Sequence, residues 1–97
     1  MPAEIRLHPD AERELRAAFL WYFDRNILVA EAFRSESIHA VNTVAESPQR
    51  WPLIANQVHR YVFPRFLFSM IYRGNNELVA TIAIAHQKRR PGYRTER

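Results

Sequence analysis

The chain has 97 residues, no cysteine and a formal net charge of +4, and 47% of its residues are hydrophobic. These values suit a single domain over residues 1–97 with a small core, and they exclude disulfides and zinc–thiolate sites. No apolar run reaches the ~20 residues needed to cross a bilayer, and the first residues lack the layout of a signal peptide. We therefore expect a cytoplasmic protein with no membrane partner.

The first predicted elements are a short strand and a helix. Residues 4–8 alternate polar and apolar side chains, which is the period of a strand with one covered face. Pro9 suits the first turn of a helix, where its missing N–H costs nothing. A helix over residues 9–25 is predicted by apolar side chains recurring at i, i+4 and i+7, namely Leu15, Phe19 and Tyr22.

A second helix is predicted from Ile27 to about residue 46, and Pro48 ends it. Its apolar stripe contains Ala30, Phe33, Ser37, Val41 and Val44. Asn26 separates the two helices and suits a turn between them, since it tolerates the left-handed conformation. Helices joined by so short a turn must be antiparallel, which makes an αα-hairpin. We expect Trp21 to be partly exposed and Trp51, in the following loop, to cover the edge of the core.

The C-terminal part of the chain predicts three strands, over residues 58–63, 66–73 and 78–85. Pro64 marks a break between the first two, and Gly74-Asn75-Asn76 supplies turn residues between the second and third. Strands grouped after helices predict an α+β fold, in which an N-terminal strand precedes an αα-hairpin packed on a small antiparallel β-sheet. From about residue 87 the chain is polar and basic, which predicts an exposed tail.

Charge is divided unevenly along the chain. Residues 1–57 hold six Arg and eight Asp or Glu, a balance of −2, whereas residues 58–97 hold eight Arg or Lys and two Glu, a balance of +6. A basic half indicates a phosphate-bearing or acidic protein partner. The alternative is a face that serves only to keep the protein soluble.

The sequence contains no signature of a nucleotide-binding loop, a metalloprotease or a serine hydrolase. The four histidines have no spacing typical of metal ligands, so we expect no metal and no cofactor, and catalytic residues stay unknown. His86 differs from the others because it ends a predicted central strand and opens a basic segment. The candidate functional surface, called the basic rim below, comprises Arg60, Arg65, His86, Lys88, Arg89, Arg90 and Tyr93.

Two stretches of the chain resemble a known family. Residues 61–73 are similar to the strand pair of ParE/RelE-type toxins of the plasmid-stabilisation class, and residues 78–91 are similar to their closing pattern A-x-x-H-x-x-R-x-P. The opening of the first helix at Pro9 is also similar. The resemblance implies a helical hairpin on a small antiparallel sheet. It also implies a toxin of a type II toxin–antitoxin system, held in a hetero-oligomer by its cognate antitoxin.

The resemblance leaves three functions open. ParE-like members inhibit DNA gyrase, whereas RelE-like members are ribosome-dependent endoribonucleases that cleave mRNA; a third alternative is a non-toxic interaction module on the same fold. The chain is more similar to ParE, because His86, Tyr93 and Arg65 fill the RNase roles of base, acid and cation only nominally. We expect the antitoxin to be an acidic, partly disordered segment that folds across the helical hairpin and against the sheet.

Overall fold

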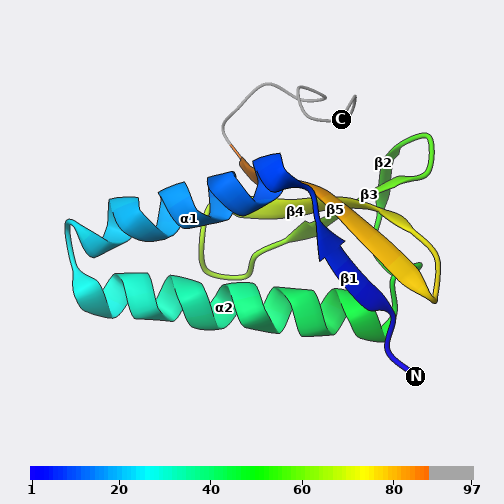
Figure 1. Cartoon of the computed structure of the whole chain (residues 1–97), viewed down its shortest axis with the longest axis horizontal. Helices are drawn as coiled ribbons and strands as arrows, with labels where there is room; N and C mark the ends of the chain where they lie inside the picture. Colours follow the sequence, from blue (N-terminus) through cyan, green and yellow to red (C-terminus); the bar gives the residue numbers. More distant parts are fainter. Residues whose placement is uncertain (88–97) are drawn as a thin grey trace.

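The first strand and the first helix follow each other directly. In the computed structural model, which describes residues 1–87, strand β1 (Glu4–Leu7) leads into helix α1 (Pro9–Phe23) (Figure 1). The His8 side chain caps the helix, since its Nδ1 accepts a hydrogen bond from the backbone N–H of Asp10 at 3.0 Å. Both elements are confirmed, and the helix ends two residues earlier than its apolar spacing predicts.

Helix α2 (Ile27–Glu46) runs back antiparallel to α1, so the αα-hairpin is confirmed. Asn26 lies between the two helices, but it does not adopt the left-handed conformation. Its backbone is extended (φ −162°), and its side chain caps α2 by accepting hydrogen bonds from the N–H groups of Leu28 and Val29 at 2.9 and 3.4 Å. A side-chain oxygen at this position satisfies donors that the first helical turn leaves unpaired, which a left-handed turn residue would not do.

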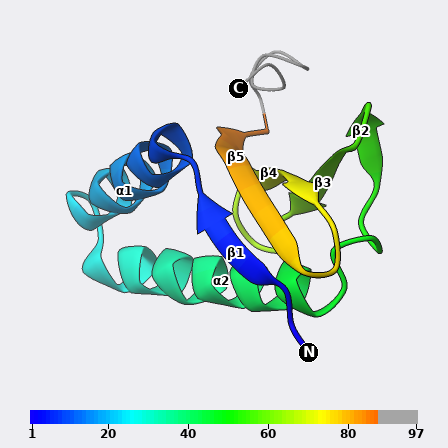
Figure 2. The same ribbon diagram turned by 45° about the vertical axis from the view of Figure 1, so that its right-hand side comes forward.

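The remaining elements are strands β2 (Leu53–Ala55), β3 (Val58–Val62), β4 (Phe68–Gly74) and β5 (Leu78–His86). They form one sheet with β1 in the order β1-β5-β4-β3-β2 (Figure 2). The sheet is mixed rather than wholly antiparallel, because β1 pairs with β5 in parallel while the other neighbours are antiparallel. Strands β2, β3, β4 and β5 alternate in direction, and β5 lies beside β1 and runs in the same direction as β1.

The main core lies between the sheet and the two helices, which cover the same face of it (Figures 1 and 2). Phe33 of α2 is at its centre and is almost fully buried. Its ring lies 5.2–6.0 Å, between centroids, from four other aromatic rings, those of Tyr22, Phe63, Phe66 and Phe68. This aromatic cluster joins both helices to β4 and to the loop before it, and so fixes the hairpin on the sheet.

A smaller cluster occupies the opposite face of the sheet. It consists of Val58, Ile71, Ile82 and Ala83, and neither helix contributes a residue to it. The alternation of side chains along β4 explains the division, since Tyr72 belongs to the main core and its neighbour Ile71 to the smaller cluster. We call the two sides the helix face and the outer face.

Candidate functional site: a helical groove and the basic rim

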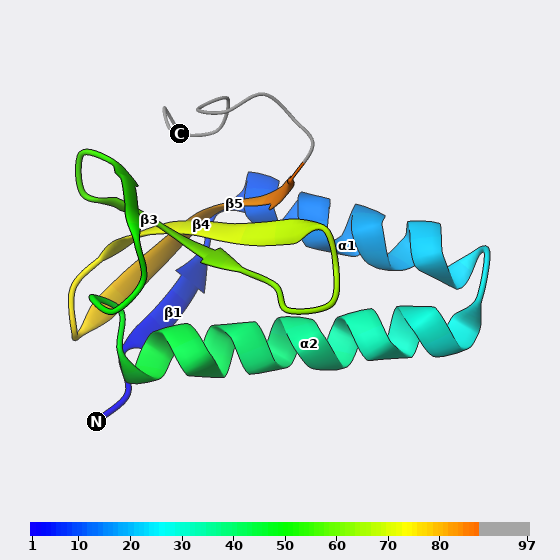
Figure 3. The ribbon, with the colours of Figure 1, turned by 180° about the vertical axis from the view of Figure 1, so that it is seen from behind.

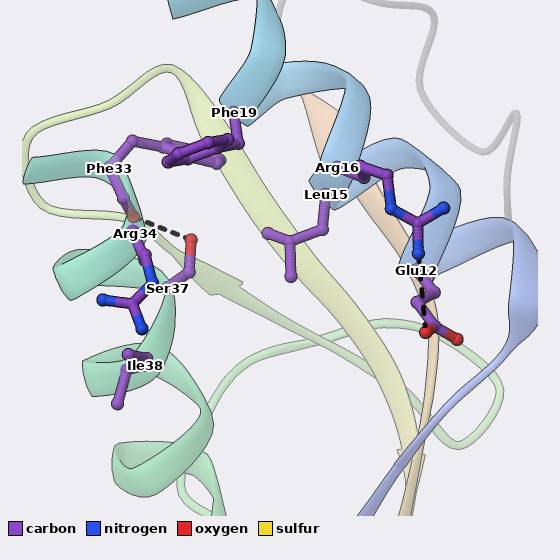
Figure 4. A pocket seen from close by; sticks show the side chains of 8 residues that line it. All are labelled: Glu12, Leu15, Arg16, Phe19, Phe33, Arg34, Ser37 and Ile38. Atoms are coloured by element: carbon purple, nitrogen blue, oxygen red, sulfur yellow. Dashed lines mark hydrogen bonds and ion pairs between the residues drawn. The ribbon is translucent and has the colours of Figure 1, made fainter. Parts of the chain in front are cut away.

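An open groove of about 360 Å³ runs between α1 and α2 (Figure 4). Its apolar lining is supplied by Leu15 and Phe19 from α1 and by Phe33 and Ile38 from α2. Ile38 is about half exposed, so part of this lining is in contact with water. A groove with an apolar floor between two helices is a common binding site for an amphipathic helix of a partner protein.

Two arginines lie on opposite sides of this groove, Arg16 on α1 and Arg34 on α2 (Figure 4). Each faces an acidic residue of its own helix at 3.9 Å: Arg16 Nη2 faces Glu12 Oε1, and Arg34 Nη1 faces Glu31 Oε2. These separations exceed hydrogen-bond length, and pairs of this exposed kind contribute little to stability. Both guanidinium groups are therefore able to bind carboxylates of a partner without breaking a strong internal contact.

The sheet separates two members of the basic rim. Arg60 is exposed on β3 and lies opposite Ile71, so it belongs to the outer face. His86 lies opposite Phe68 at the end of β5, and the two rings meet edge to face with centroids 5.2 Å apart. Because Phe68 also packs on Phe33 of α2, His86 is on the helix face. These two side chains therefore lie on opposite faces of the sheet.

Arg65 lies in the loop between β3 and β4, where it is tied to α2. Its backbone N–H donates to Glu36 Oε2 at 2.9 Å, and its Nε–H donates to Glu36 Oε1 at 2.8 Å. The Glu36 side chain is only 4% exposed, whereas that of Arg65 is 69% exposed. The arginine therefore satisfies a buried carboxylate and still presents part of its guanidinium group to solvent.

Glu36 is the structurally important residue that the sequence interpretation missed. It lies three residues after Phe33, on the buried side of α2, and a carboxylate in such a position needs donors nearby. That spacing was the available signal. Burial raises the pKa of Tyr61 and the charge of Glu36 raises it further, while a hydrogen bond with Thr43 opposes the shift.

The rest of the basic rim, Lys88, Arg89, Arg90 and Tyr93, lies outside the described residues, as does most of the predicted basic tail. The chain leaves the sheet at Gln87, whose backbone N–H donates to the Leu67 carbonyl oxygen at 2.8 Å. Its side-chain amide donates to the Phe68 carbonyl oxygen at 3.0 Å. Residue 87 is thus held beside the loop that carries Arg65.

The two tryptophans lie in different surroundings. Trp21 is 54% exposed, and the guanidinium carbon of Arg25 lies 3.7 Å from its ring centroid. Trp51 is half-buried at the edge of the main core, where it meets Tyr61 edge to face with centroids 4.8 Å apart. Both placements agree with the positions expected from the sequence.

Neither a metal centre nor a membrane span is found in the described part of the chain. Within residues 1–87, no three His, Cys, Asp or Glu side chains are grouped so that they could hold a metal ion. No helix in the same range is long and apolar enough to cross a bilayer.

Comparison with known proteins decides the family. Residues 5–91 match the family described as the ParE toxin of type II toxin–antitoxin system, parDE. The chain belongs to the ParE toxin family. Among curated protein sequences, none matches this chain.

This ParE-family chain also shares its fold with a solved structure, a chain of the chromosomal ParDE toxin–antitoxin system from P. aeruginosa. The TM-score is 0.74 and the sequence identity is 15%, over 87% of this chain and 95% of that one. At this identity the likeness establishes the fold alone. It confirms the α+β fold class predicted from the sequence, although the sheet is mixed and not wholly antiparallel.

Proposed function

We propose that this ParE-family chain is the toxin of a toxin–antitoxin pair and that it inhibits DNA gyrase by binding, without cleaving RNA. Family membership supports the toxin role. The separation of Arg60 from His86 supports a binding mechanism, because Arg60 lies on the outer face and His86 on the helix face. This separation is the observation that carries the proposal.

RNA cleavage through the 2′-hydroxyl requires a base, an acid and a cation placed around one phosphate. Within residues 1–87, Arg60 lies on the opposite face of the sheet from His86, and the Nε of Arg65 is already bound to Glu36, which argues against such a group. A protein surface that blocks a large enzyme needs no such convergence, since charge and shape act over a wide area.

The decisive experiment compares two assays on the same purified chain. Inhibition of gyrase-catalysed DNA supercoiling, with intact mRNA in a translating extract, is the expected result. Codon-linked mRNA cleavage without an effect on supercoiling would establish the endoribonuclease alternative instead. Absence of both effects, in a chain that is folded and binds its antitoxin, would favour the non-toxic interaction module.

An alanine scan of the basic rim tests the mechanism inside cells. For a binding surface we expect graded losses of growth arrest, with Arg89→Ala and Arg90→Ala weaker toxins than His86→Ala. Removal of a general acid or base from an RNase typically costs ~10²–10⁴ in rate. One position that abolishes toxicity alone, in a folded protein made at matched levels, would contradict the gyrase proposal.

We propose that the antitoxin places an acidic amphipathic helix in the groove between α1 and α2. The apolar floor would bury its apolar face, and Arg16 and Arg34 would bind its carboxylates. Arg16→Glu combined with Arg34→Glu should weaken the complex and its salt dependence together. Arg6→Glu on β1 changes the charge as much as Arg16→Glu alone, so it is the control for that single variant and should leave affinity within twofold. Equal effects of both changes would place the antitoxin elsewhere.

A further inference from the structure

A small cavity lies between the helices and the sheet, next to the groove described above. Its volume is about 10 Å³, and its lining comes from β1, α1, α2, β4, β5 and the loop after β3, an arrangement that Figure 3 shows from behind. Leu15 and Ser37 line both the cavity and the groove, so the two adjoin each other. A cavity of this volume has room for about one water molecule.

The lining of the cavity is mostly apolar but not entirely so. Among the described residues, nine side chains line it, of which seven are apolar and two carry hydroxyl groups. The hydroxyl groups belong to Thr81 of β5 and Ser37 of α2, so one comes from the sheet and the other from a helix. A wholly apolar cavity of this size stays dry, whereas polar groups in the wall are able to hold a water molecule.

Thr81 carries the stronger of the two signals, because its hydroxyl group is buried without a partner. The residue is 0% exposed, and within residues 1–87 its Oγ1 has no hydrogen-bond partner. Thr81 pairs with Tyr72, which belongs to the main core, so its side chain lies on the helix face. An unpaired buried hydroxyl group destabilises a fold, and the cavity that Thr81 lines is where a partner for it fits.

Ser37 supplies the second contact that an internal water molecule needs. Its hydroxyl group donates to the Phe33 carbonyl oxygen at 2.8 Å, so the lone pairs of its Oγ remain available as acceptors. We propose that the cavity binds one structural water molecule, which bridges Thr81 Oγ1 and Ser37 Oγ. The bridge connects β5 to α2 through the core and holds the α2 wall of the groove against the sheet.

Thr81→Val tests the proposal, because valine keeps nearly the shape of threonine and lacks the hydroxyl group. If the hydroxyl group binds the water molecule, the variant loses that hydrogen bond, and the equilibrium constant of folding should fall about fivefold. If the cavity is dry, the native hydroxyl group is an unpaired buried donor, and its removal should raise the constant. Urea denaturation measures the constant, and circular dichroism checks the fold. An unchanged or higher constant would overturn the proposal.

Internal water molecules are counted independently by magnetic relaxation dispersion of the oxygen-17 nucleus of water. In the whole chain, Thr81→Val is expected to hold one long-lived water molecule fewer than the native protein. Leu53→Val, at a side chain of β2 that is 63% exposed, is the control and should leave the count unchanged. A crystal structure should place the water within hydrogen-bond distance of both hydroxyl groups. Equal counts in the native protein and Thr81→Val, or a water that contacts neither hydroxyl group, would contradict the bridge.

Discussion

Helix α2 is apolar in both halves, but the halves have different surroundings. In the half that lies over the sheet, Phe33, Ala40 and Val44 are each at most 1% exposed. In the first turn, Ile27 and Leu28 are mostly exposed although they are equally apolar. This end of α2 extends beyond the strands (Figure 1) and packs only against α1, so side chains there that do not face α1 stay exposed. Burial is therefore decided by what faces a side chain, and composition alone does not reveal it.

The largest expected effect on stability is that of Phe33→Ala, in the part of α2 that packs on the sheet. The ring is the centre of the aromatic cluster, so its removal should lower the free energy of unfolding by about 3–5 kcal/mol. Leu28→Ala, in the exposed turn, should change it by less than about 0.5 kcal/mol. Urea denaturation of both variants measures the contrast. Similar losses from both variants would show that the first turn of α2 is packed in solution.

Glu36→Gln tests the buried polar contact in the sheet-facing half. The amide keeps the shape but loses the charge that receives two hydrogen bonds from Arg65, so we expect a loss of about 1–3 kcal/mol. In a double-mutant cycle with Arg65→Ala, the coupling should be at least about 0.5 kcal/mol. Strictly additive losses would mean that the two side chains do not interact in solution.

Tyr72→Phe should cost about 0.5–1.5 kcal/mol at neutral pH, because the Pro48 carbonyl oxygen loses its phenol donor, 2.7 Å away. Burial raises the pKa of Tyr72 from 10.0 to about 12. The folded phenol thus keeps its proton where the unfolded one loses it, so stability is complete below pH 10 and is lost as pH rises towards 12. Thermal unfolding between pH 9 and 12 should show a shallower alkaline loss in the variant. Identical slopes would exclude this titration.

The smallest effect is expected at the turn. Asn26→Ala should cost about 1 kcal/mol because two N–H groups of α2 lose their cap, whereas Asn26→Gly should cost only a few tenths. If the residue were instead a left-handed turn, glycine would stabilise the protein. Equilibrium unfolding of the two variants separates these cases.

The periodic parts of the fold could be predicted from the sequence, and the irregular parts could not. Both helices and strands β3, β4 and β5 have apolar side chains at regular spacing over many residues. Strand β2 has only Leu53, Ile54 and Ala55, all exposed, so no alternation distinguishes it from a loop. Asn26 suits a cap and a turn equally well by residue type, and only its neighbours' backbone geometry decides between them.

The site was harder to predict because it depends on strand register. A shift of one residue moves a side chain to the other face of a sheet, and β4 and β5 change register between Ile71 and Tyr72. Arg60 lies opposite Ile71 and His86 lies opposite Phe68, three residues apart on β4, so the pairing of all three strands has to be known before the two side chains can be assigned to opposite faces. The sequence could predict that Arg60 and His86 lie near the same end of the sheet, but it could not predict that they lie on opposite faces of it.

The parallel pair of β1 and β5 also governs when the protein becomes complete during synthesis. Glu4 of β1 pairs with Leu78 of β5, so the first strand cannot pair until β5 has been synthesised. The helical hairpin depends on contacts close in sequence and is able to form early, whereas closing the sheet carries the entropy cost of a very long loop. The sheet thus stays incomplete until β5 has been made and has left the ribosome, and the surface that both strands carry forms only then.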